Sequence, residues 1–459
     1  MTKKFNERQF ILYGLNYIVG FGFIATISNV IKNGWAGSIV FILITLISVM
    51  VALTFSRAAK YYPDEIGSTY SYSRKVFSKR TSFYFGWNAY IQGPILSAAS
   101  PLFFTQIIFV AKPEWQNYEL LVSLISVFIF IGLYVISALG LHISKPLAFI
   151  TGALKFVVIF IALILVVELI FKEGQHAYFI DNITTVPKDI SAYSIAGVAI
   201  SFLYAFGGLE GLVSIGKDSD KINLRKVLMI IFFIVFASYF TVYVIFLNLP
   251  TNLLTSNNLF LNIYAKGLPA IGIALFAIGL FFNRASGIIM GGVINARILV
   301  VLAQDGYFPK LLAKENKNGE FSYAIVANLI ITFASMIIFN LIPRLINQQD
   351  AFQTVLELGT AAFLIQYIST TIIVLFMNNK KLIGNIKIWE LVIYWLGIII
   401  GLTLILLWAI PNISGVAWTS QNTIQIVSYI AFILVGYVIY YGTFMFKKHK
   451  DNKSNTILK

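Results

Sequence analysis

The chain has 459 residues, of which 58% are hydrophobic and 12% are charged, and its mean hydropathy is +0.83. Soluble globular proteins carry about 25% charged residues, so this composition excludes that class and indicates a polytopic membrane protein. The sequence has no cysteine, which excludes disulfides, thiol nucleophiles and cysteine-bound metals. Its three histidines, His142, His176 and His449, lie near predicted loops and the tail, so we expect no metal site and no cofactor.

The net charge of +15 arises from basic residues beside alternate helix ends, so it does not indicate a nucleic-acid partner. Twenty-six of the 34 lysines and arginines flank the helix ends that we assign to one face, and six flank those of the other face. By the positive-inside rule, this asymmetry predicts that both termini are cytoplasmic and that the number of spans is even. We expect a multi-pass protein of the cell membrane.

Twelve segments are long enough to span a bilayer, whose hydrocarbon core needs about 20 helical residues. They are expected at residues 10–31, 36–56, 83–110, 119–139, 146–170, 191–214, 228–249, 268–302, 322–342, 352–377, 388–410 and 424–446. Most connections are short and polar, so the chain is expected to form one membrane domain. The short basic tail, 447–459, is expected to be disordered and cytoplasmic.

Two of these segments are interrupted by glycine. Gly20-Phe21-Gly22 lies in the middle of the first segment, and Phe206–Glu210 places Gly207 and Gly208 in the sixth. If helices 1–5 (10–170) and 6–10 (191–377) are two copies of one unit, the odd number of spans makes them inverted copies. The breaks would then meet at mid-membrane, as in the substrate sites of secondary transporters. For either break alone, close helix packing is the alternative explanation.

Three stretches, in the right order, resemble the amino acid/polyamine/organocation (APC) transporter superfamily. Asn295–Leu299 and Ala303–Lys310 resemble its segment after helix 8, Tyr62–Tyr70 its loop between helices 2 and 3, and Tyr204–Glu210 its broken helix 6. The resemblance implies an all-α membrane fold with twelve transmembrane helices in a LeuT-like 5+5 inverted repeat, helices 1 and 6 being discontinuous. Two extra helices, 388–446, would follow and face lipid or a dimer partner, so the oligomeric state stays open.

The resemblance also implies a site for a zwitterionic amino acid. Amides at one half-helix start suit the carboxylate, and carbonyls at the other half-helix end suit the ammonium. The residues expected to bind substrate are Ile18, Gly20, Phe21, Gly22, Tyr204, Ala205, Phe206 and Gly207. Tyr204 aligns with the family's aromatic lid, although an ordinary interfacial tyrosine is the alternative. Glu210 is expected to gate the site or orient a helix. The bulky Phe21 departs from the family's usual pattern and puts the identity of the substrate in doubt.

Lys155 lies nine residues after Pro146, about 14 Å along the fifth helix and near the bilayer midplane. Ionisable residues at this depth are costly and are candidates for function. In proton-coupled members of the superfamily, a lysine in this helix replaces a sodium ion, and Leu154–Val157 resembles that position. The resemblance therefore implies a proton-coupling role for Lys155. The alternative is a structural ammonium bonded to carbonyls of helices 1 and 8.

Arg284 is the one charged residue in the window 268–296 and lies past mid-depth. Either it forms an ion pair with a carboxylate such as Glu210 or Glu357, or it faces the pocket and recognises an acidic side chain. We favour the structural ion pair, because an unpaired buried arginine would be costly in the empty site.

The sequence thus predicts a secondary active transporter rather than an enzyme, moving amino acids or related organic amines by alternating access. Proton-coupled symport is preferred, and substrate exchange is the alternative. The expected partners are an amino acid, a proton and the lipid bilayer. A channel would show rings of charge, and a membrane-embedded enzyme would show clustered histidines or carboxylates. Neither pattern is visible, and no phosphate-binding loop of an ATP-driven pump occurs.

Overall fold

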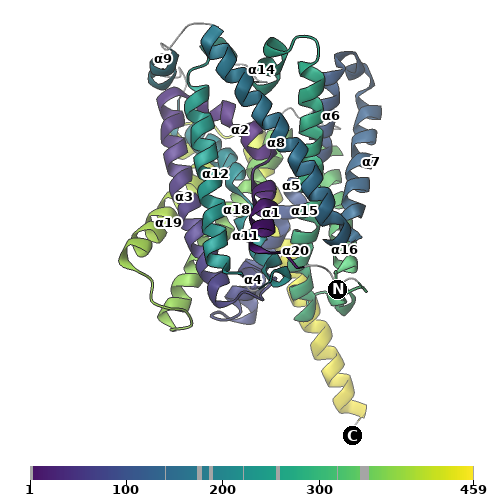
Figure 1. Cartoon of the computed structure of the whole chain (residues 1–459). Helices are drawn as coiled ribbons and strands as arrows, with labels where there is room; N and C mark the ends of the chain where they lie inside the picture. Colours follow the sequence, from purple (N-terminus) through teal and green to yellow (C-terminus); the bar gives the residue numbers. More distant parts are fainter. Residues whose placement is uncertain are drawn as a thin grey trace.

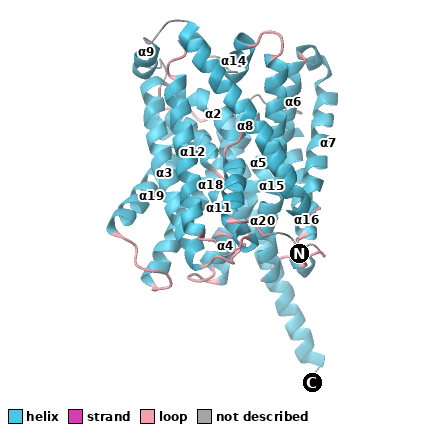
Figure 2. Cartoon of the chain, viewed as in Figure 1, coloured by secondary structure: helices cyan, strands magenta, loops and turns pink. Residues whose placement is uncertain are grey.

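The computed structural model describes residues 4–139, 141–172, 178–185, 190–220, 222–254, 259–317, 319–341 and 351–457. Within these ranges the protein is a bundle of helices without β-strands (Figures 1 and 2). Eleven of the described helical segments are long and apolar enough to cross a membrane. In lipid, helices satisfy all backbone polar groups within one segment, which explains this architecture. The protein is a multi-pass membrane protein.

The first predicted segment consists of two short helices, α1 (Glu7–Ile18) and α2 (Phe21–Ile31). A capping box between Asn6 and Gln9 starts α1. The chain leaves the helical conformation at Val19 and Gly20, where the glycine triplet begins. Neither half has the length of a span, so this segment is not among the eleven.

The sixth predicted segment is interrupted as well. It consists of α10 (Ala192–Leu203), the 3-10 turn η2 (Tyr204–Phe206), α11 (Leu209–Leu212) and η3 (Val213–Asp218). Gly208 has φ of +129°, a conformation that residues with a side chain rarely adopt. Glycine at this position therefore lets the chain turn between η2 and α11.

The other predicted spans are helical, with ends that differ from the predicted ones by several residues. They are α3 (Gly34–Tyr61), α5 (Lys79–Ala98) with α6 (Ser100–Ala111), α7 (Glu119–Ala138), α8 (Leu141–Lys172), α12 (Leu224–Phe246), α15 (Gly272–Gln304), α16 (Ser322–Met336) with the π-helical η5 (Ile337–Leu341), α18 (Ala351–Asn379), α19 (Ile388–Ala409) and α20 (Ser420–Ile457).

Two features were not expected from the sequence. The tail is not disordered as far as it is described, because α20 continues to Ile457. No glycine or proline follows Gly442 to end the helix, and the lysines there are good helix formers. Predicted loops also contain short helices, namely η1 (Pro113–Tyr118), α4 (Thr69–Ser73), α9 (Tyr178–Thr184), α13 (Thr251–Leu254), α14 (Leu259–Gly267), η4 (Lys310–Ala313) and η6 (Pro411–Ser414).

The helix α15 lies at the centre of the bundle, where it contacts α5, α6, α7, α8, α14 and α16. Its glycines allow close approach, since a Cβ atom on Gly279 would stand 2.4 Å from Cγ1 of Val158 in α8. The half-helix α1 packs against α8, α12 and α15, and α2 packs against α3, α10 and η2. Both ends of the chain lie at the same end of the bundle (Figure 1).

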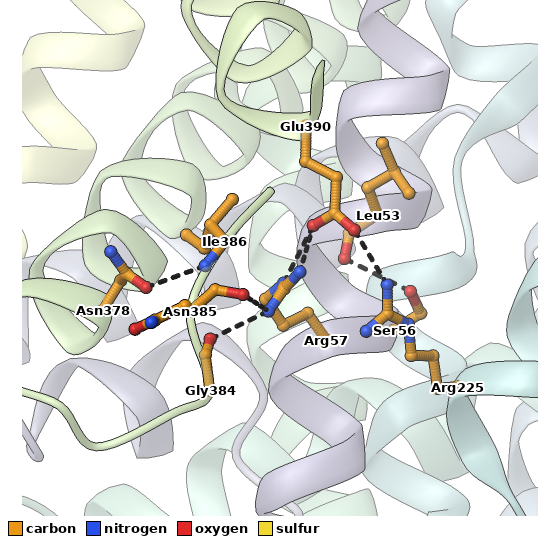
Figure 3. Close-up of polar contacts among 9 residues, drawn as sticks. All are labelled: Leu53, Ser56, Arg57, Arg225, Asn378, Gly384, Asn385, Ile386 and Glu390. Carbon is orange, nitrogen blue, oxygen red and sulfur yellow. Dashed lines mark hydrogen bonds and ion pairs between the residues drawn. The ribbon is translucent and has the colours of Figure 1, made fainter. Parts of the chain in front are cut away.

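A buried ionic cluster ties α19, which lies outside the two predicted repeats, to the bundle (Figure 3). Glu390 of α19 is 1% exposed and accepts hydrogen bonds from Arg57 Nε of α3 and Arg225 Nη2 of α12, both at 3.0 Å. Arg57 Nη1 also donates to the carbonyl oxygen of Gly384 at 3.0 Å. One carboxylate therefore pairs with arginines from two different helices. Such pairing offsets part of the cost of burying the charges.

Candidate functional site

The two interrupted segments contact each other at their glycines. A Cβ atom on Gly22 would stand 2.9 Å from Cδ1 of Tyr204 and 3.1 Å from Cα of Ala205. Across the same junction, a Cβ atom on Gly208 would stand 2.8 Å from Cγ1 of Ile18. The missing side chains at 22 and 208 let the two backbones approach this closely. The two breaks therefore lie side by side.

A cavity of about 130 Å³ lies beside this junction. One buried water needs about 10–15 Å³ of such space, so the cavity has room for a small organic molecule. Its walls come from both breaks and from α5, α8, α15 and α18. The residues singled out in the sequence that line it are Ile18, Gly20, Gly22, Lys155, Tyr204, Gly207, Glu210 and Arg284.

One face of α15 lines the cavity with small and amide side chains. Asn283, Gly287, Gly291 and Asn295 follow one another at intervals of four residues and so lie on one side of the helix. A Cβ atom on Gly287 would meet no described atom within 4 Å. This glycine therefore leaves space for a ligand, whereas Gly279 of the same helix makes room for Val158.

The first break presents unpaired donors to the cavity. Gly20 precedes α2 in an extended conformation, and no side chain caps the start of this helix. An anion there would meet free N–H groups and the positive end of the helix dipole. Asn283 is 4% exposed, and its Nδ2 has no hydrogen-bond partner in the described part of the chain. The side chain of Phe21 lies outside the described residues, so its influence on the pocket stays a prediction.

Tyr239 of α12 bonds the backbone carbonyl groups of two residues that the sequence predicts to bind substrate. Its hydroxyl donates to the carbonyl oxygen of Ala205 at 3.0 Å and to that of Ile18 at 3.3 Å. The ring of Phe206 packs against the ring of Tyr239, with centroids 5.1 Å apart. Neither Ala205 nor Phe206 lines the cavity, so the structure places both behind its wall. Tyr239 itself has no distinctive sequence pattern that would have revealed it.

Lys155 of α8 is 1% exposed, and its Nζ donates to the carbonyl oxygen of Asn16 at 2.6 Å. This carbonyl lies in the last turn of α1, where the break removes the usual helical donor and the dipole favours a cation. The Asn16 side chain extends the contact, since its Nδ2 donates to the Ala148 carbonyl oxygen at 2.7 Å and to Ser286 Oγ at 2.8 Å. Among the described residues, Lys155 thus hydrogen-bonds directly to the first broken helix, and the Asn16 side chain links this site to α15.

Arg284 of α15 does not form the ion pair that we favoured from the sequence. Its Nη1 donates to the Tyr204 hydroxyl at 3.3 Å, and its Nη2 donates to Ser100 Oγ and to the carbonyl oxygen of Leu96 at 3.5 Å. Among the described residues, no carboxylate lies within 4 Å of it. The guanidinium therefore has only neutral protein partners and lines the cavity.

Glu210 caps the second break. Its Oε2 accepts from the backbone N–H of Gly208 at 3.0 Å and from the Tyr367 hydroxyl at 2.9 Å. Its carbonyl oxygen accepts from Ser68 Oγ at 2.8 Å. The carboxylate also lies in the first turn of α11, where the positive end of the helix dipole stabilises a negative charge. These bonds position the restarted helix against α18 and the residue that precedes α4.

Two glutamines that the sequence did not single out also line the cavity. Gln92 of α5 donates through Nε2 to Oε1 of Gln366 in α18, and Gln366 donates in turn to Thr69 Oγ1 at 2.8 Å. Gln92 Oε1 is buried and has no partner among the residues that the structure describes. Polar residues inside apolar helices are a usable sequence signal, but many such residues serve packing alone.

The sequence profile of the family described as "Amino acid permease" matches residues 6–450. The chain belongs to the amino acid permease family. This permease therefore comes from a family of membrane transporters. The contact between its interrupted helices is thus a feature of a transporter fold.

Relatives from Mycoplasma cover nearly all of the permease's length. It is 30% identical to "Uncharacterized protein MG225" of Mycoplasma genitalium, over 99% of this chain and 97% of the relative. It is also 30% identical to "Uncharacterized protein MG226" of the same organism, over 95% and 94% of the two chains. A more distant relative is the "Putative amino-acid transporter CPE0389" of Clostridium perfringens, 24% identical over 72% and 71% of the two chains.

Proposed function

We propose that this permease is a secondary active transporter that moves amino acids or related organic amines across the plasma membrane by proton-coupled symport. The observation that carries the proposal is the cavity at the contact between two interrupted helices. A continuous helix offers no free backbone groups to a polar solute, whereas broken helices offer both N–H groups and carbonyls. The family membership and the printed name of the clostridial relative support an amino acid as the solute.

We propose further that α1 and α2 together form one span, which with the eleven full-length spans gives twelve. Helices 1–5 and 6–10 would then be inverted copies in a LeuT-like arrangement. Both ends of the chain at one end of the bundle (Figure 1) support an even number of spans. The basic residues at that end support a cytoplasmic location for both termini.

In the proposed mechanism, the substrate carboxylate binds the free amides of residues 20–22, and the ammonium binds the carbonyl end of α1 and Gly207. Tyr204 closes the site, since its ring already lies against Gly22. Lys155 couples the proton, because its ammonium bonds to the last turn of α1. Losing that proton would weaken the hold on a helix that the substrate also contacts.

Uptake into proteoliposomes tests this proposal. Purified permease is reconstituted and supplied with radiolabelled amino acids, with and without an inwardly directed proton gradient. We expect gradient-driven accumulation that a protonophore abolishes. If the permease works by substrate exchange instead, uptake will require amino acid preloaded inside the vesicles and will not depend on the proton gradient. If no amino acid enters under either condition, the transporter proposal fails.

A further inference from the structure

Arg284 is a cation in the wall of the cavity, and no described carboxylate pairs with it. Its hydrogen bonds go to the Tyr204 hydroxyl, Ser100 Oγ and the Leu96 carbonyl oxygen, all neutral acceptors. Its Nε is buried and has no partner in the described ranges. Neutral acceptors orient a guanidinium but leave its charge uncompensated, which is costly away from bulk water. A bound anion would compensate this charge.

Both carboxylates that were candidates for pairing with Arg284 are bonded elsewhere. Glu210 Oε2 accepts from the Gly208 amide and the Tyr367 hydroxyl. Glu357 Oε1 accepts from Gln353 Nε2 at 2.8 Å, and its Oε2 accepts from Trp408 Nε1 at 3.2 Å and Gln425 Nε2 at 2.9 Å. These bonds hold both groups in place without Arg284.

The side chain of Tyr204 contacts both the first break and Arg284. Cδ1 of its ring lies against Gly22, at the free amides of α2, and the hydroxyl at the far end of the ring accepts from Arg284. The Tyr204 side chain therefore extends from the first break to the guanidinium. A molecule with two carboxylates on a short chain could contact both groups.

The charges of the wall favour the same class of molecule. Among the described residues, the charged side chains that line the cavity are the cations Lys155 and Arg284 and the anion Glu210. An acidic amino acid carries a net charge of −1 and balances the excess positive charge. A basic amino acid would add to it, and a neutral one would leave it in place.

We propose that the substrate of this permease is an acidic amino acid, whose side-chain carboxylate binds Arg284 while its α-carboxylate binds the amides of α2. The inference rests on the proposed transport function and narrows its substrate. The planar guanidinium binds a carboxylate through two parallel hydrogen bonds, so it distinguishes a carboxylate from the amide of the same shape. Glutamate is therefore favoured over glutamine, and aspartate over asparagine.

Ligand-induced thermal stabilisation of the purified full-length permease tests the inference. The ligands are L-glutamate, L-aspartate, L-glutamine, L-asparagine, L-leucine and L-lysine, each titrated to give an apparent affinity. We expect the acidic amino acids to bind roughly 10- to 100-fold more tightly than their amides. Arg284→Gln is expected to remove this preference and leave the affinity for the amides nearly unchanged. Arg80→Gln, which removes an exposed arginine from the start of α5, should retain the preference.

The results separate the two proposals. Glutamine binding as tightly as glutamate to the wild-type protein overturns the assignment of Arg284 but leaves the transport proposal standing. Binding of none of the six amino acids overturns the acidic-substrate assignment, and the uptake measurement in proteoliposomes then decides the transport proposal separately. Arg284→Lys covers the case in which Arg284→Gln does not fold, because it keeps the charge and loses the two-pronged geometry. It is expected to keep part of the preference for glutamate, and an unchanged preference would contradict recognition by the guanidinium fork.

Discussion

Lys155 and Arg284 are both cations deep in the bundle, yet they contact different parts of the site. Lys155 bonds to a backbone carbonyl of α1 and is almost fully buried, so its charge is linked to the position of a broken helix. Arg284 bonds to the Tyr204 hydroxyl, Ser100 Oγ and the Leu96 carbonyl oxygen, and it lines the cavity. A change of protonation at Lys155 would act on helix α1, whereas Arg284 is placed to act on the ligand itself.

Lys155→Ala is expected to abolish uptake driven by a proton gradient while substrate binding remains measurable. The variant removes the titratable contact to α1 but none of the backbone amides at the first break. Uptake and ligand-induced thermal stabilisation are measured on the same preparation. Lys172→Ala, at the exposed end of the same helix, is the matched control and should behave as wild type. Unaltered gradient-driven uptake by Lys155→Ala would disprove the coupling role.

The interrupted helices depend on individual glycines for different reasons. Gly22 is needed for close contact with Tyr204, whereas Gly208 is needed both for its positive φ and for contact with Ile18. The segment after the second break is held at its far end by Arg297 of α15, whose Nη1 lies 2.6 Å from Asp218 Oδ2 and 2.7 Å from the Ser214 carbonyl oxygen. The break is therefore a fixed part of the fold rather than a frayed helix.

Gly208→Ala is expected to lower both thermal stability and uptake. A side chain at φ of +129° costs about 1–3 kcal/mol, and its Cβ atom would also collide with Ile18. Gly415→Ala provides the control, since Gly415 also has positive φ, at +71°, but no described atom lies within 4 Å of an added Cβ. The Gly415→Ala change should lower stability by only about 1 kcal/mol, since Gly415 lies in the left-handed region that other residues can adopt, and it should keep its uptake. Equal loss of uptake in both variants would show that backbone strain alone is responsible.

At the scale of the whole molecule, the Glu390 cluster joins α3, α12 and α19 through one buried carboxylate (Figure 3). Glu390→Gln is expected to reduce the free energy of unfolding by about 3–5 kcal/mol, because it leaves Arg57 uncompensated in the interior. Glu168→Gln removes an exposed ion pair with Lys172 and should change stability by less than about 1 kcal/mol. Thermal melting in detergent measures both variants. Similar melting temperatures for the two would contradict a stabilising role for the cluster.

Much of the fold could be predicted from the hydropathy and the glycines of the sequence. What could not be predicted depends on physical features that the sequence does not encode locally. Long apolar segments must be helical in a membrane, and Gly208 marks a turn that few other residues adopt. The sequence does not distinguish Gly287, which faces the cavity, from Gly279, which faces Val158, since both are glycines of one helix. Nor does it reveal that Tyr239, one of 24 tyrosines, bonds both breaks, or that Arg284 has no carboxylate partner among the described residues. Such facts depend on helix rotation and packing.

The central claim is that the cavity beside the two breaks binds the transported amino acid, and Gly287→Leu tests it most directly. The space over Gly287 accepts a side chain, and leucine is a better helix former than glycine, so the variant should fold normally. We expect its affinity for amino acids, measured by thermal stabilisation, to fall more than roughly tenfold, since a leucine side chain occupies about the volume of several waters in the site. Gly132→Leu makes the same change in α7 and serves as the control. No described atom lies within 4 Å of an added Cβ on Gly132, and this residue does not line the cavity, so the variant should bind as wild type. Wild-type affinity in Gly287→Leu would contradict the assignment of the site.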